Sequence, residues 1–229
     1  MIALSIVVPT RNRADHLRRC LASLDKARAA AVPVDVVVLD DGSSDATSEV
    51  LQAARALGQV DSTIRRPTAG GPAAARNLGW RAASGTLIAF TDDDCEVDHD
   101  WLAALSAALS SRPESVAGVG GRVLPGAEDR VSAYMTLHRI LEPPVSLRYV
   151  VTANCILRRS ALEAVGGFDE AVVAPGGEDP GLCLKLGQLG YTFAFEPRAL
   201  VTHHYRPGYR EFLRTFYRYG KGCRIVMDT

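Results

Sequence analysis

The chain has 229 residues, of which 47% are hydrophobic and 23% are charged, and its formal net charge is 0. This length supports one domain with a substantial core or two intimate lobes, and the composition is that of a globular protein. A chain without net charge has no global field that would draw it onto nucleic acid or anionic lipid.

The five cysteines are scattered and form no C-x-x-C pair, which argues against a zinc knuckle or a disulfide framework and favours a reducing compartment. No apolar run is long enough to span a bilayer, and the first residues predict a strand rather than a signal peptide. We therefore expect a cytoplasmic protein whose domain starts at the N-terminus. The last residues, CRIVMDT, carry no stop signal, so a chain cut short at this end is an open alternative.

Strands and helices alternate in the first half of the chain. Apolar runs predict strands at 4–9, 34–40 and 86–90. Amphipathic spacing predicts helices between and after them, the second with Ser43 or Ser44 as its N-cap. The predicted helices cover 13–24, 43–57, 70–84 and 100–111. This order predicts an α/β fold with a mostly parallel central sheet flanked by helices.

The second half is less regular. Its apolar runs predict strands at 115–124, 149–159, 192–197 and 199–205. Three helices are predicted, the first of them stopped by Gly166 and Gly167. They cover 159–170, 178–191 and the basic tail 209–222. Because no repeat or linker interrupts the chain, we expect one domain over residues 1–229.

Two acidic clusters follow predicted strands: Asp40-Asp41 follows VVVL, and Asp92-Asp93-Asp94 follows LIAF. Ligands of parallel sheets bind at the carboxyl ends of the strands, so both clusters fall where a site is expected. One interpretation of the triplet is a solvated turn that caps the next helix. The other is a site for Mg²⁺ or Mn²⁺, which commonly bridge one or two carboxylates to a diphosphate. In an extended segment, Asp92 and Asp94 would share a ligand and Asp93 would point elsewhere.

Two common nucleotide motifs are missing. The first strand is followed by PTRNRADH instead of G-x-G-x-x-G, and no G-x-x-x-x-G-K-[ST] occurs, which argues against a nicotinamide-binding Rossmann domain and a P-loop. Asp40 ends its strand, where it can accept a hydrogen bond from a base or a ribose hydroxyl. Gly70 and Gly71 precede a helix that carries Arg76 in its second turn. This segment is either a loop before a packing helix or a mobile loop whose Arg76 reaches a base or a phosphate.

Six segments occur in the order PTRNR, VVVLDDGSSDAT, ARNLG, FTDDDCE, GGFDE and GGEDPGLCLKLGQLGY. Together they resemble the family 2 glycosyltransferases of the GT-A fold, and the likeness covers essentially the whole chain. Each motif alone is weak, whereas the ordered set is specific. The resemblance implies transfer of a sugar from a nucleotide-diphosphate donor to an acceptor hydroxyl, usually with inversion. It also implies UDP-sugars as the favoured donors, with guanosine and thymidine donors left open, and Mn²⁺ or Mg²⁺ as the cofactor.

The resemblance further implies roles for individual residues. Asp40 would contact the base, Asp92 the ribose and Asp94 the metal, and Arg76 would help to bind the nucleotide. The neighbouring positions assigned to the same nucleotide site are Pro9, Thr10, Arg11, Asp41 and Asp93. Residues 1–98 would form the nucleotide-binding half and residues 99–204 the acceptor and catalytic half.

The family's catalytic base maps to Asp179, with Glu178 beside it. An inverting transfer needs one carboxylate that deprotonates the attacking hydroxyl and electrophilic help for the leaving diphosphate, but no second acid. Both residues also fit as helix N-terminal acids, a position whose dipole lowers a carboxylate's basicity. The family often has E-D-x-D-L, whereas Gly181 stands here in place of the second acid. An unusual acceptor side and an impaired activity are therefore both open.

Two adjacent histidines, His203 and His204, end a predicted strand. Adjacent strand residues face opposite ways, so at most one of them reaches a metal ion. Family members often have a histidine at the end of a segment resembling ALVTH, which favours His203 as a metal ligand. A structural role for this histidine is the alternative.

The tail places four arginines at intervals of four residues, which predicts one basic stripe on a helix. They are Arg206, Arg210, Arg214 and Arg218. Either the helix packs on the domain with its arginines solvated, or it lies on a membrane or binds a lipid-diphosphate-linked acceptor. We expect a lipid-linked or small-molecule acceptor and consider peripheral contact of 205–229 with the cytoplasmic face of a membrane. Nucleic acid is not expected, because it would not explain the acids at the strand ends.

Two other functions stay open. A nucleotidyltransferase would form pyrophosphate from a nucleoside triphosphate, whereas a glycosyltransferase releases a nucleoside diphosphate. A catalytically silent nucleotide-sugar-binding domain would bind the donor without turnover, and Asp179→Asn would change nothing in it.

Overall fold

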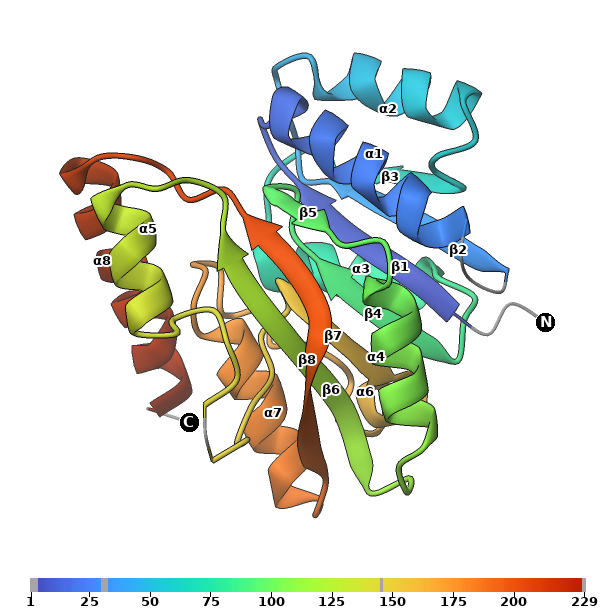
Figure 1. Cartoon of the computed structure of the whole chain (residues 1–229), viewed down its shortest axis with the longest axis vertical. Helices are drawn as coiled ribbons and strands as arrows, with labels where there is room; N and C mark the ends of the chain where they lie inside the picture. Colours follow the sequence, from blue (N-terminus) through green and yellow to red (C-terminus); the bar gives the residue numbers. More distant parts are fainter. Residues whose placement is uncertain (1–3, 30–32, 145, 228–229) are drawn as a thin grey trace.

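The computed structural model describes residues 4–29, 33–144 and 146–227 (Figure 1). One eight-stranded sheet runs through it in the order β3-β2-β1-β4-β7-β6-β8-β5. The strands are β1 (Leu4–Thr10), β2 (Val34–Asp40), β3 (Ser62–Arg65), β4 (Leu87–Thr91), β5 (Cys95–Val97), β6 (Val116–Pro125), β7 (Asn154–Arg158) and β8 (Thr192–His203). The ends of the predicted domain, at residues 1 and 229, lie outside the described residues.

Helices cover both faces of this sheet (Figure 1). They are α1 (Ala14–Ala29), α2 (Thr47–Ala56), α3 (Pro72–Ala82), α4 (Trp101–Ser110), α5 (Arg130–Leu137), α6 (Arg159–Val165), α7 (Glu178–Gln188) and α8 (Tyr209–Met227). All seven helices that the sequence predicts are present, although their ends differ. The predicted α/β class is therefore confirmed. The sequence did not predict β3, β5 or α5, which are short and lack a clear period of their own.

The first half of the chain forms the parallel part of the sheet. β1 pairs in parallel with β2 and β4, and β2 pairs in parallel with β3. The register sets Thr10 beside Asp40, and the amide of Asp41 donates to the carbonyl of Thr10 (2.9 Å). β4 ends at the same edge, directly before the acidic triplet. Both acidic clusters therefore meet at one edge of the sheet, as predicted.

The second half makes the sheet mixed. β7 is antiparallel to both β4 and β6, and β5 is antiparallel to β8, while β6 and β8 are parallel. The two strands predicted at 192–197 and 199–205 are one strand, β8. Its register against β6 jumps between Glu196 and Leu200. Pro197 lies in this irregular stretch, because it has no N–H to donate to a ladder.

Alternate residues of the parallel strands pack into two separate hydrophobic cores, one on each face of the sheet. Ile6 and Val8 pack with α1, α2 and α4 on one face, and Val7 packs with α3, α6 and α7 on the other. These side chains are fully buried, which explains why β1 and β2 read as nearly continuous apolar runs. The sheet is thus covered on both faces, so a binding site is expected at the ends of its strands.

The start of α2 differs from the sequence prediction. The helix begins at Thr47, and the carboxylate of Asp45 accepts hydrogen bonds from the amide (3.1 Å) and the hydroxyl (2.5 Å) of that residue. The expectation that Ser43 or Ser44 caps the helix is wrong. The amide of Ser43 instead donates to the carboxylate of Asp40 (2.8 Å), which closes the turn after β2.

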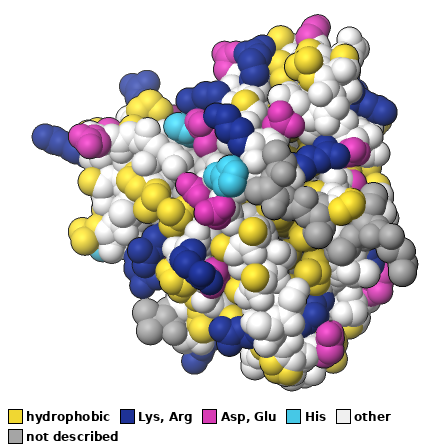
Figure 2. Space-filling view, turned by 45° about the vertical axis from the view of Figure 1, so that its right-hand side comes forward, with side chains coloured by type: hydrophobic (Ala, Val, Ile, Leu, Met, Phe, Trp, Pro, Cys, Tyr) yellow, Lys and Arg dark blue, Asp and Glu magenta, His cyan; other side chains and the backbone are white. Residues whose placement is uncertain are grey.

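The long α8 lies beside α5 at one end of the molecule (Figure 1). Tyr134 of α5 stacks edge-on against Phe212 and Phe216 of α8, with ring centroids 5.1 and 5.8 Å apart. Within the described residues, no helix has the length and apolarity needed to cross a bilayer. On the face drawn in Figure 2, basic and acidic side chains are interspersed, in line with the net charge of zero.

Candidate active site

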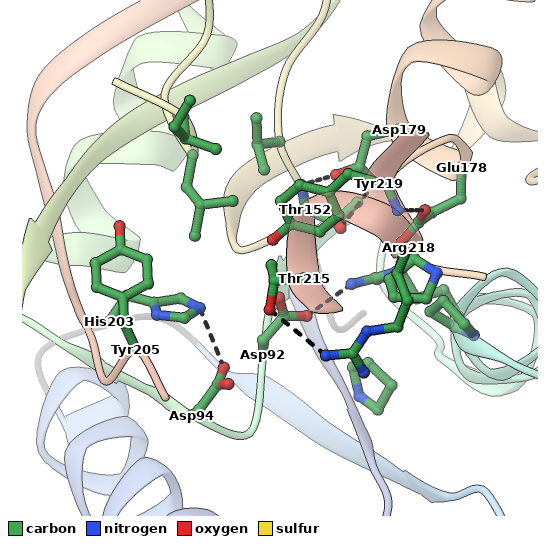
Figure 3. Close-up of a pocket in the computed structure, with 18 of the residues that line it drawn as sticks. Asp92, Asp94, Thr152, Glu178, Asp179, His203, Tyr205, Thr215, Arg218 and Tyr219 are labelled. Carbon is green, nitrogen blue, oxygen red and sulfur yellow. Dashed lines mark hydrogen bonds and ion pairs between the residues drawn. The ribbon is translucent and has the colours of Figure 1, made fainter. Parts of the chain in front are cut away.

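A cavity of about 1420 Å³ opens where the strand ends meet. Its wall is formed by the end of β1, the acidic triplet after β4, the first turns of α3 and α7, the segment that follows α5, the segment that follows β8, and one face of α8. Figure 3 shows acidic side chains from two of these elements, the triplet after β4 and the first turn of α7, around the same space. The site therefore collects residues from nearly the whole length of the chain.

The charges of the acidic triplet are compensated by neighbouring side chains. Arg13, just before α1, donates through Nη1 to Asp93 (2.9 Å) and also contacts Asp94. Asp93 further accepts a hydrogen bond from the hydroxyl of Thr10 (2.7 Å). Burial raises the pKa of Asp93 to about 7 in spite of Arg13. Burial acts the same way on Asp94, but His203 and Arg13 outweigh it and hold the pKa of that carboxyl below its usual value.

The predicted directions of the three aspartates are only partly right. Residues 92–94 form a turn rather than an extended strand. Asp93 and Asp94 consequently share Arg13, whereas Asp92 turns towards Arg76. The expectation that Asp93 points away from its neighbour Asp94 is wrong, because the alternation of side chains holds only in extended backbone. A ligand shared by Asp92 and Asp94 stays a prediction.

Arg76 joins the triplet to the first turn of α7. Its Nη2 donates to Asp92 (2.7 Å) and its Nη1 to Glu178 (3.0 Å), and its side chain is 5% exposed. Glu178 also accepts a hydrogen bond from the amide of Gly176 (2.6 Å). Arg76 lines the cavity, yet both of its terminal nitrogens already bind carboxylates. The sequence contains no sign of this bridge, because its ends lie 102 residues apart.

Asp179 lies at the cavity wall and is anchored by Thr152. Its carboxylate accepts hydrogen bonds from the backbone amide (3.0 Å) and the hydroxyl (2.8 Å) of that threonine (Figure 3). Burial, reinforced by the neighbouring charge of Glu178, raises the pKa of Asp179 to about 7. This outcome opposes the lower basicity expected from the helix dipole alone. Thr152 was not identified from the sequence, since an isolated threonine carries no signal there.

The two histidines face different neighbours, as predicted for adjacent strand residues. His203 directs Nε2 at Asp94 Oδ1 (3.4 Å) inside the cavity, and its ring stacks on Tyr205 (Figure 3). His204 directs Nε2 at Glu96 Oε1 (2.6 Å) and is not part of the cavity wall. The thiol of Cys95 lies within 4.8 Å of the ligand atoms of Asp94 and His203. Burial raises the pKa of this thiol well above its usual value.

The other predicted nucleotide residues divide into two groups. Asp41 lines the cavity and holds the loop before α3 by accepting hydrogen bonds from the amides of Gly70 and Gly71 (both 2.9 Å). Asp40 is 1% exposed and does not line the cavity. Its Oδ2 is buried without a hydrogen-bond partner, while Arg65 lies 3.5 Å away. The remaining cavity-lining members of the predicted set are Pro9, Thr10, Arg11, Arg76, Asp92 and Asp93.

α8 is a wall of the cavity rather than a solvated appendage. Arg218 and Tyr219 reach into the cavity from it (Figure 3). Arg210 and Arg214 stay exposed, and Arg206 precedes the helix. The prediction of one basic stripe is therefore wrong, because a spacing of four residues turns about 40° further around a helix at each step.

Close glycine contacts fix α8 against the start of α7. A side chain at Gly222 would place its Cβ 2.7 Å from the amide nitrogen of Gly177. One at Gly181 would lie 3.2 Å from a methyl group of Val226. The glycine that replaces the family's second acid thus makes room for α8. We call these contacts the glycine seam.

Sequence and structure comparisons agree on the class of protein. Residues 5–166 match the model of glycosyl transferase family 2. The chain is 34% identical over 227 residues to the pre-mycofactocin glycosyltransferase of Mycobacterium tuberculosis, covering 93% of this chain and 45% of that protein. It thus spans about half the length of that relative.

Two solved structures share the fold. One is the mannosyltransferase PcManGT from Pyrobaculum calidifontis in complex with GDP-Man and Mn²⁺, with a TM-score of 0.72 and 22% identity over 96% of this chain and 64% of that one. The other is S. aureus TarS 1-349 in complex with UDP-GlcNAc, with a TM-score of 0.67 and 19% identity over 92% and 61% of the chains.

These likenesses define the fold as GT-A, the α/β fold of nucleotide-diphospho-sugar transferases. The family match covers well over half of the 229 residues, and the chain belongs to glycosyl transferase family 2. The resemblance found in the sequence is thereby confirmed for family and fold. The roles of individual residues stay predictions.

Proposed function

We propose that this chain is an inverting, metal-dependent glycosyltransferase that moves a sugar from a nucleotide-diphosphate donor to an acceptor hydroxyl. The observation that carries the proposal is Asp179. Its carboxylate is held at the cavity wall by Thr152 and has a pKa near neutrality, which suits a general base at physiological pH. The family membership supports the reaction class.

Asp179 would take the proton of the acceptor hydroxyl while the acceptor oxygen forms a bond to C1 of the sugar. The bond between C1 and the diphosphate oxygen breaks in the same step, and the nucleoside diphosphate leaves with the electron pair. Thr152 would fix the orientation of the carboxylate. Glu178 would influence the catalytic base Asp179 only indirectly. Its charge raises the pKa of Asp179, while its own carboxylate accepts hydrogen bonds from Arg76 and from the amide of Gly176.

The donor would lie along the edge of the sheet where the two acidic clusters meet. We assign Asp92 to the ribose and Asp41 to the loop that borders the nucleotide, beside Pro9, Thr10 and Arg11. Asp40 lies beneath this wall, so its contact with the base would require access to its buried Oδ2. Arg76 would fix Asp92 relative to the first turn of α7, because its two terminal nitrogens bind Asp92 and Glu178 instead of a phosphate.

The residues present fit a divalent cation. Asp94 and His203 offer one oxygen and one imidazole nitrogen 3.4 Å apart, which leaves the other coordination positions to a diphosphate and water. We propose these two residues as the ligands of Mn²⁺ or Mg²⁺. Such a cation would neutralise charge that develops on the leaving diphosphate.

We place the acceptor in the part of the cavity between Asp179 and α8. Tyr149 and the segment 139–144 line that part, together with Arg218 and Tyr219. Residues 1–98 would thus form the nucleotide-binding half and 99–204 the acceptor half, completed by 205–229. A lipid-linked acceptor and a small molecule both fit an aromatic wall that carries an arginine.

Thermal unfolding with UDP, GDP, TDP and CDP, each with Mn²⁺ and with EDTA, tests the donor site. The folded protein should gain about 2.7 kcal/mol at a ligand concentration of 100 Kd, which is about 5–11 °C for a chain of this size. The gain should require Mn²⁺ and should fall in His203→Ala. UDP is the first candidate, and a response to GDP alone would move the proposal to guanosine donors. No response to any nucleotide would refute the site.

Asp179→Asn separates the enzyme from its alternatives. Release of the nucleoside diphosphate from a nucleotide sugar should fall about 10²–10⁴-fold while donor binding is kept. Asp100→Asn is the control, because that side chain is 77% exposed and lies outside the cavity wall. Unchanged turnover in Asp179→Asn would refute the role of Asp179 as the catalytic base. Donor binding without any turnover in the unaltered chain would indicate a silent binding domain, and pyrophosphate release from a nucleoside triphosphate would indicate a nucleotidyltransferase.

A further inference from the structure

The outer face of α8 combines exposed apolar and basic side chains. Tyr209, Leu213 and Tyr217 recur every four residues and are 65%, 66% and 70% exposed. Leu137 of the neighbouring α5 is 79% exposed. Exposed basic residues of the same helix include Arg210, Arg214 and Lys221. We call these seven residues the α5–α8 face.

The charge on this face has one sign. Glu211 is the single acidic residue between Tyr209 and Met227, and its side chain is 27% exposed and paired with Arg214 (2.6 Å). Arg210 and Lys221 make no ion pair with a carboxylate among the described residues; Lys221 lies over the ring of Tyr217 at 6.0 Å. A protein with zero net charge thus concentrates unpaired positive charge beside its exposed tyrosines and leucines.

The fold holds this face rigidly. The inner side of α8 is fixed by the glycine seam and by the thiol of Cys223, which donates to the carbonyl of Gly176 (3.1 Å). Its aromatic contacts with Tyr134 keep α5 alongside. Phe216 and Tyr219 belong to the cavity wall and not to the α5–α8 face. A partner on the α5–α8 face would therefore leave the site intact.

We propose that the α5–α8 face binds the surface of an anionic lipid bilayer. An amphipathic helix with tyrosine and leucine on its outer side and arginine and lysine around them lies in the headgroup region, where the rings reach the interface and the cations meet lipid phosphates. A second copy of the chain is a poorer occupant, because a twofold contact would bring the same cations together. Nucleic acid would leave Leu213 and Leu137 without an apolar partner.

Vesicle co-sedimentation tests the proposal on the full chain. Vesicles of phosphatidylglycerol and phosphatidylcholine should bind the protein, and pure phosphatidylcholine should bind it far more weakly. The double variant Arg210→Glu/Lys221→Glu should bind about 25-fold more weakly or worse, since each basic residue near the surface contributes about fivefold. Lys26→Glu/Arg55→Glu, on α1 and α2, is the matched charge control and should bind like the unaltered chain.

Leu213→Ser should also weaken binding, whereas Leu57→Ser, at a position 74% exposed after α2, should not. Melting temperatures of all variants confirm that each is folded. Absence of binding to anionic vesicles, or equal loss in the control variants, would overturn the proposal. A dimer that Leu213→Ser converts to a monomer would assign the face to a second copy and would overturn it too. Nucleotide stabilisation of the same variants, measured without vesicles, tests the donor site separately.

Discussion

Replacing Arg76 by Met should destabilise the protein strongly. Arg76 donates to Asp92 (2.7 Å) and to Glu178 (3.0 Å), and the side chains of Arg76 and Glu178 are each 5% exposed. Methionine is similar in length but carries no charge, so Glu178 would stay buried without its cation. Removing one partner of a buried ion pair costs about 3–5 kcal/mol. For a chain of this size, the melting temperature should fall by about 6–20 °C.

Urea and thermal unfolding of Arg76→Met, Glu178→Gln and the double variant measure this effect. The double variant should be less destabilised than the sum of the single variants, by about 0.5–3 kcal/mol, because a neutral glutamine needs no cation. Arg81→Met lies on the same helix with its side chain 46% exposed, and it should cost no more than about 1 kcal/mol. A cost below about 1 kcal/mol for Arg76→Met, or strictly additive costs, would refute the buried bridge.

Two further predictions concern the base and the glycine seam. Because Asp179 has a pKa of about 7 and acts only when deprotonated, kcat/KM should rise tenfold per pH unit below pH 7 and level off above it; a flat profile between pH 5 and 8 would contradict the role of Asp179. Gly222→Ala should cost about 1–3 kcal/mol and lower turnover, because its Cβ would stand 2.7 Å from the Gly177 amide. Gly220→Ala, whose Cβ meets nothing within 4 Å, should not destabilise α8, and equal effects of the two changes would argue against the seam.

The positions of the acidic clusters could be predicted from the sequence because they depend on local patterns. A buried apolar run predicts a strand, alternation with amphipathic helices predicts parallel pairing, and the carboxyl ends of parallel strands share an edge. These patterns alone place Asp40-Asp41 and Asp92-Asp93-Asp94 at one edge of the sheet. The ordered motifs further identified the family.

The partners of those acids could not be predicted, because they come from distant parts of the chain. Arg13 neutralises Asp93 and Asp94 across about 80 residues, and Arg76 reaches Glu178 across 102. Nothing in the local sequence marks which arginine faces which carboxylate. The turn at 92–94 likewise decided the side-chain directions. It brings Asp93 and Asp94 to the same arginine, whereas an extended segment would point them to opposite sides.

The sequence by itself determined the fold class, the family and the edge of the sheet where the acidic clusters meet, because these follow from local periodicity and ordered motifs. Only the tertiary structure decided how α8 is used. The sequence leaves open whether the tail packs on the domain with its arginines solvated or lies on a membrane. In the structure its glycines let the backbone approach α7, and Arg218 and Tyr219 line the cavity. In the sequence, Gly181 looks like the loss of the family's second acid. In three dimensions it is the space that a packed helix requires, since a side chain there would meet Val226.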